Sequence, residues 1–200
     1  MRRIFSVLTL ILFATHANAL SVSDLSNTEA SGGLKEALIQ GAGKAVAKLG
    51  AVDGFYGNEQ VKIPLPDSMK RAEKVMRMFG MGKQADELVL KMNRAAEAAV
   101  PEAKALLVDS VKKMTLADAK SVLMGGDDAA TQYFKKTTSG PMAEKFLPIV
   151  KKATESVKLA QQYNKFAEMG SQYGLVKKDQ ANLEQYVTQK TLDGVYLMMA

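Results

Sequence analysis

Apolar residues recur every three or four positions along nearly the whole chain, the spacing of one face of an α-helix. The first such stripe contains Leu34, Leu38, Ala42, Ala45 and Leu49. Similar stripes occur within residues 69–79, 85–99, 106–114 and 146–160. No stretch of comparable length alternates with the period of two that marks a strand. The pattern predicts an all-α fold, a single-domain irregular bundle of roughly seven or eight helices.

Residues typical of helix ends separate these stripes. Thr115 and Asp118 have the spacing of a capping box. Asp127 is the expected N-cap of a helix that runs to residue 136, and Pro141 the expected first-turn residue of a separate long helix. Asp179 is the expected cap of the last helix.

The longest irregular stretch, residues 51–67, holds Ile63-Pro64-Leu65-Pro66. Two prolines favour an extended backbone there, and the aliphatic side chains should pin this connection to the helical core. We therefore place no domain boundary in it and expect one domain over residues 20–200.

Residues 1–19 have the features of a cleavable secretory signal. Arg2 and Arg3 precede an apolar run of eleven residues, and Ala17-Asn18-Ala19 provides the small residues that signal peptidase requires. Cleavage would leave 181 of the 200 residues, soluble in the periplasm, and lower the net charge from +6 to +4. The uncapped apolar run 195–200 predicts that the natural chain continues beyond Ala200.

The processed chain would contain neither histidine nor cysteine, since His16 is the one histidine and there is no cysteine. This composition excludes Ser-His-Asp and Cys-His nucleophiles and metal sites built on imidazole or thiolate. We expect no cofactor, no metal site and no catalytic residue. The sequence also contains no recognisable nucleic-acid-binding module.

Several blocks of the sequence resemble the bacterial domain-of-unknown-function family 4197. They are Gly32-Gly33-Leu34-Lys35-Glu36-Ala37-Leu38, Asp53-Gly54-Phe55, Ile63-Pro64-Leu65-Pro66, Asn93-Arg94-Ala95-Ala96-Glu97, residues 125–134, Tyr186-Val187-Thr188-Gln189-Lys190 and Leu192-Asp193-Gly194. The resemblance implies a small exported helical protein of Gram-negative bacteria, with no established activity or catalytic residues. Similar members extend past the position of Ala200.

Five residues are candidates for contact with a ligand or partner. Asp127 and Asp128 follow two glycines and could bind a hard cation, but they fit a helix start better because no alternating acids accompany them. Phe55 and Tyr56 could form the lip of a groove, or anchor their loop in the core. Tyr133 lies in the block that resembles the family and is the fifth candidate.

These observations favour a non-enzymatic periplasmic module that binds a partner protein or an apolar ligand. Eleven methionines remain after Met1, and such side chains suit adaptable apolar pockets as well as plain cores. The alternative is a carboxylate-dependent hydrolase acting on an envelope polymer, which needs two carboxylates across a cleft. The positive charge would also assist contact with anionic lipid at a membrane surface.

Overall fold

The computed structural model describes residues 27–80, 82–155, 157, 160–164 and 182–200. The elements are α1 (Asn27–Leu49), η2 (Asp67–Met69), α2 (Lys70–Met78), α3 (Gly82–Ala99), η3 (Val100–Glu102), α4 (Ala103–Lys113), α5 (Leu116–Leu123), α6 (Ala129–Thr154) and α8 (Leu183–Met199). None of these described residues forms a strand. The predicted all-α fold is confirmed.

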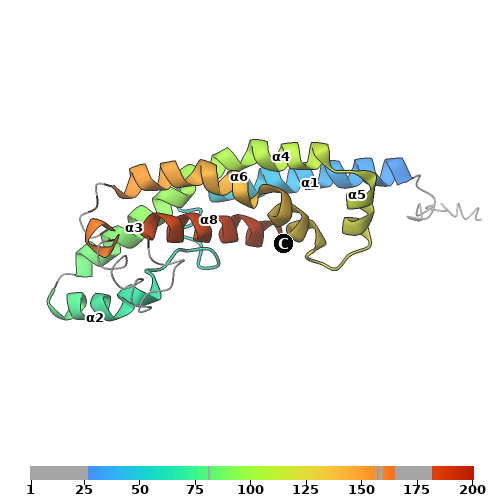
Figure 1. The fold of residues 1–200 in the computed structure, drawn as a ribbon. Coiled ribbons are helices and arrows are strands. Elements are labelled where there is room, and N and C mark those ends of the chain that lie inside the picture. The colour runs from blue at the N-terminus through green and yellow to red at the C-terminus, as the bar shows by residue number, and fades with distance from the viewer. Residues whose placement is uncertain (1–26, 81, 156, 158–159, 165–181) are drawn as a thin grey trace, which may run out of the picture.

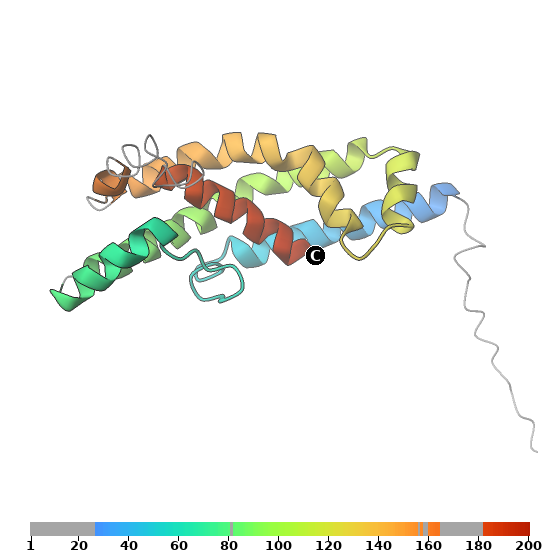
Figure 2. The same ribbon diagram turned by 60° about the horizontal axis from the view of Figure 1, so that its bottom comes forward.

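The helices form an elongated bundle (Figure 1). α6 packs most extensively against α3 and α8, and α1 packs against α4. The α2–α3 hairpin lies at one end of the bundle, and α5 with the start of α1 lies at the other (Figures 1 and 2). The centre is filled by fully buried apolar side chains, among them Leu88, Met92, Leu107, Met142 and Phe146.

The expected helix start at Pro141 is wrong, because α6 continues through Pro141 and Pro148 from Ala129 to Thr154. One predicted helix boundary therefore disappears. Figure 2 shows that α6 bends in its first half, as a helix does where proline removes a backbone donor. Packing against α3 and α8 stabilises α6.

Two expected helix caps are also corrected. Asp128, one residue later than predicted, is the N-cap residue of α6, and its side chain makes no capping hydrogen bond. The last helix is capped by Asn182, whose side chain accepts a hydrogen bond from the Gln185 amide; the predicted cap, Asp179, lies outside the described residues. The capping box of Thr115 and Asp118 is confirmed at the start of α5.

Within the described residues, no helix is both long enough and apolar enough to cross a membrane.

Candidate functional site

The loop between α1 and η2 is fastened to α3 by Asn93, a fully buried residue. Its Oδ1 accepts a hydrogen bond from the Ile63 amide at 2.8 Å, and its Nδ2 donates to the Ile63 carbonyl at 2.9 Å. The same Nδ2 also donates to the Val89 carbonyl of α3 at 2.8 Å. A side chain that pairs with both backbone groups of one residue takes the place of a strand partner, so it holds Ile63 and Leu65 in the core.

One helical turn further, Glu97 holds the tip of the same loop. Its Oε1 accepts hydrogen bonds from the amides of Phe55 and Tyr56, both at 3.1 Å. Its Oε2 accepts from Arg94 Nη1 at 2.6 Å, and Arg94 Nη2 reaches Asp53 at 2.8 Å. The loop is thus tied to α3 by a carboxylate that is 5% exposed and fully partnered, as a buried charge must be.

Phe55 is an anchor of this loop, because its side chain is fully buried and offers no surface to a ligand. Its ring lies against Gly194 of α8, where an added Cβ would come within 2.7 Å of Phe55 Cε1. Tyr56 is half-buried, and its ring faces Lys62 Nζ at 4.8 Å and the Arg94 guanidinium at 5.9 Å. The loop is therefore a packing device that joins α3 and α8.

Asp127 and Asp128 are exposed in the turn before α6. Asp128 accepts a hydrogen bond from Gln132 Nε2 at 3.0 Å, one turn into the helix. Across the described residues, no group of three or more acidic, histidine or cysteine side chains is placed to hold a metal ion.

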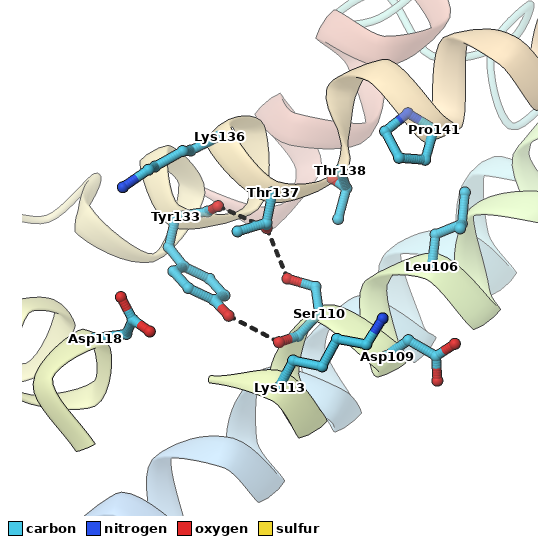
Figure 3. Close-up of a pocket in the computed structure, with 10 residues that line it drawn as sticks. All are labelled: Leu106, Asp109, Ser110, Lys113, Asp118, Tyr133, Lys136, Thr137, Thr138 and Pro141. Atoms are coloured by element: carbon cyan, nitrogen blue, oxygen red, sulfur yellow. Dashed lines mark hydrogen bonds between the residues drawn. The ribbon is translucent and has the colours of Figure 1, made fainter. Parts of the chain in front are cut away.

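Tyr133 differs from the other four candidates because it lines a groove. This groove, of about 400 Å³, lies between α4 and α6 with α5 at one end (Figure 3). It is lined by Leu106, Asp109, Ser110, Lys113, Asp118, Tyr133, Lys136, Thr137, Thr138 and Pro141. The structure brings Tyr133 into this site but not Phe55, Tyr56, Asp127 or Asp128.

Hydroxyl groups fix the walls of the groove. Tyr133 Oη donates to the Ser110 carbonyl at 2.7 Å, and the hydroxyls of Ser110 and Thr137 lie 2.6 Å apart (Figure 3). The hydroxyl of Thr138, which also lines the groove, lies 3.0 Å from the hydroxyl of Tyr196 in α8. Because these bonds join α4, α6 and α8, the groove is preformed, which lowers the entropic cost of binding.

The groove combines apolar and charged surfaces. Leu106 and Pro141 lie at one end, and the Tyr133 ring lies toward the other, beside Asp118 and Lys136 (Figure 3). Hydrogen bonds from the side chain and backbone of Thr115 hold the pKa of Asp118 below its usual value, and Lys136 lowers it further. A carboxyl in this environment stays ionised, and this is the opposite of what a general acid requires.

This lowered pKa predicts that Asp118 stabilises the fold only while it is ionised. Replacing it by asparagine should lower the melting temperature at pH 7, because the hydrogen bonds from the Thr115 amide and hydroxyl lose their charged acceptor. The difference from the wild type should shrink as the pH falls below the ordinary value of 3.8, since a carboxyl with a depressed pKa in the folded state loses its contribution there. Thermal unfolding followed by circular dichroism, at pH 7 and at a pH below 3.8, measures the two differences in melting temperature. Asp127→Asn is the matched control and should change neither melting temperature; an Asp118→Asn difference that persists at low pH would contradict the prediction.

The sequence did not single out Asn93, Glu97, Ser110 or Thr137 as contact residues. Asn93 and Glu97 did carry a recognisable feature, because two polar residues four apart share one helix face with buried alanines. Ser110 and Thr137 carried none, since small hydroxyl residues are ordinary on half-exposed helix faces.

Of the comparisons with known proteins, the one with family models agrees with the blocks noted in the sequence. No curated protein matches the chain significantly, and no solved structure does. The family match covers residues 24–200, which include every described element from α1 to α8. The chain therefore belongs to the family described as protein of unknown function DUF4197.

Proposed function

We propose that this protein is a non-enzymatic binding module of the periplasm, and that it holds a small apolar or amphipathic ligand in the groove between α4 and α6. The observation that carries the proposal is the preformed groove with Leu106, Pro141 and the Tyr133 ring on its surface. Its volume of about 400 Å³ falls within the range of small-molecule sites.

Two lysines and two aspartates line the groove, so an anionic group of a ligand can be paired there only with a lysine. Lys113 and Lys136 both line it and both are exposed. A ligand with an apolar body could lie against Leu106 and Tyr133 while its anionic end meets either lysine, since long lysine side chains keep their charge in water.

The same geometry argues against the hydrolase alternative. Asp109 and Asp118 are the carboxylates of the groove, and they lie at different ends of it, on α4 and α5 (Figure 3). Acid–base hydrolysis of a glycoside needs one carboxyl with a raised pKa facing a second across the scissile bond, whereas Asp118 has a lowered pKa.

The periplasmic location is proposed from residues 1–19, with their two arginines, apolar run and Ala17-Asn18-Ala19. All described helices begin at Asn27 or later, so cleavage after Ala19 would remove none of them.

The test is to express the full chain in a Gram-negative host, release the periplasm and analyse the purified protein by native mass spectrometry. We expect a polypeptide that starts at Leu20 and carries an additional mass that organic solvent extracts. Leu106→Trp should fill the groove and lose this mass. Glu144→Trp, an equally large change at an exposed position of α6 outside the groove, should retain it.

Titration with anilinonaphthalene sulfonate, an anionic aromatic probe, provides a second measurement. The wild type and Glu144→Trp should bind it with similar affinity, and Leu106→Trp should bind it at least about tenfold more weakly. The proposed function is wrong if the wild type carries no ligand and all three proteins bind the probe equally.

A further inference from the structure

The tip of the α2–α3 hairpin exposes two adjacent large apolar side chains. Met78 is 83% exposed and Phe79 is 74% exposed. They lie at the end of α2, directly before Gly80, whose φ of 75° turns the chain toward α3. Figures 1 and 2 place this hairpin at the end of the bundle, away from α5. Single exposed apolar residues are ordinary, but a projecting pair requires an explanation.

Basic residues cluster in the same segment of the chain. Residues 70–83 contain five basic residues and one acidic residue, a net charge of +4. Residues 20–200 as a whole also carry +4. Asp67, Asp86 and Glu87 flank this run, so residues 67–87 carry +1 and the basic excess is confined to the tip.

Some of these basic side chains form ion pairs within the protein, and others do not. Arg77 bridges Glu73 of α2 at 2.8 Å and Asp86 of α3 at 2.6 Å, which holds the two helices together. Lys70 pairs with Asp67 at 2.7 Å. Lys74 and Lys83 are both exposed, and neither forms an ion pair with the side chains that the structure describes.

We propose that this hairpin tip, defined by Lys74, Met78, Phe79 and Lys83, docks the protein on the surface of an anionic phospholipid bilayer. The Phe79 ring and the Met78 thioether would enter the boundary between headgroups and acyl chains. The two lysines would stay at the level of the phosphates, the arrangement of interfacial amphipathic segments. Anionic lipid attracts such cations within a Debye length.

A second exposed pair supports this reading by contrast. Leu123 and Met124 at the end of α5 are also exposed, at 49% and 86%, but Asp127 and Asp128 follow them. With Lys120 and Asp118 included, residues 116–128 carry a net charge of −2, so this segment lacks the basic excess of the hairpin tip. Apolar exposure and positive charge thus coincide at the hairpin tip and not at α5.

The experiment uses the chain from Leu20 to Ala200, so that the apolar run near the N-terminus does not contribute. Binding to vesicles is measured by co-sedimentation, with phosphatidylcholine alone or mixed equally with phosphatidylglycerol. We expect the wild type to bind the anionic vesicles and to dissociate as salt is added. Met78→Ser/Phe79→Ser should weaken this binding at least about tenfold, and Lys74→Glu/Lys83→Glu should abolish the preference for phosphatidylglycerol.

Leu123→Ser/Met124→Ser is the control, since it removes a second adjacent pair of exposed apolar side chains, and it should bind within about twofold of the wild type. All variants change exposed side chains, so their circular dichroism spectra should equal that of the wild type. The inference is overturned if the wild type binds neutral and anionic vesicles equally, or if both serine variants lose binding to the same extent. It is also overturned if ultracentrifugation shows that the wild type is a dimer and that Met78→Ser/Phe79→Ser is a monomer. None of these results affects the groove, whose ligand is tested separately.

Discussion

Replacing Glu97 with alanine is expected to lower the free energy of unfolding by about 3 kcal/mol. In the wild type, one carboxylate accepts hydrogen bonds from two consecutive backbone amides, those of Phe55 and Tyr56, and from Arg94. Alanine leaves both amides without this acceptor. An unsatisfied buried donor costs about 1–3 kcal/mol, more than the original bond contributed.

Chemical denaturation with urea measures this change, and thermal unfolding should show a fall of roughly 6–12 °C for a domain of this size. Glu97→Gln should cost about half as much, because its amide oxygen can still accept from Phe55 and Tyr56 while its amide nitrogen faces the donor Arg94. Glu87→Ala, an exposed glutamate on the same helix, should change stability by less than about 0.5 kcal/mol. Equal effects of Glu97→Ala and Glu87→Ala would show that the loop does not depend on the buried carboxylate.

Helical periodicity was sufficient to locate most of the bundle, because each helix buries one apolar face. The stripe from Leu34 to Leu49 became α1, and the capping box of Thr115 and Asp118 starts α5 as predicted. Ile63 and Leu65 are buried, so the prediction that they pin the long loop to the core is confirmed. These features depend on residues close together in the chain, and that is why the sequence alone reveals them.

The prediction was wrong where tertiary packing outweighed a local preference. Pro141 normally marks a helix start, yet it lies inside α6, which packs against α3 and α8. The candidate site was only partly predicted for a similar reason. Tyr133 was identified, but its groove depends on Ser110 and Thr137, which lie 27 residues apart. Phe55 was one of the candidates, and its surroundings come from Glu97 and Gly194 on distant helices.

The contact between Phe55 and Gly194 gives the second large expected effect. Gly194→Ala should destabilise the protein by about 2 kcal/mol, although alanine favours a helix over glycine by about 1 kcal/mol. The new Cβ would lie 2.7 Å from Phe55 Cε1, 3.0 Å from Phe55 Cζ and 3.3 Å from Val61 Cβ. Since Phe55 is fully buried, its ring has no open space to enter. Overpacking of this kind costs about 1–3 kcal/mol or more.

Gly41→Ala is the control that separates helix propensity from packing. Gly41 lies within α1, and an added Cβ there meets nothing within 4 Å, so this variant should gain up to about 1 kcal/mol in urea denaturation. Phe55→Leu shortens the side chain that Gly194 faces and should cost about 1–2 kcal/mol by itself. In the double variant the new methyl group can occupy the space that the ring leaves, so its loss should be clearly smaller than the sum of the two single losses. Additive losses would mean that α8 and the loop do not meet at this point. Non-additive losses would show that residues 55 and 194, which are distant in sequence, are energetically coupled, and that their contact helps to hold α8 against the rest of the bundle.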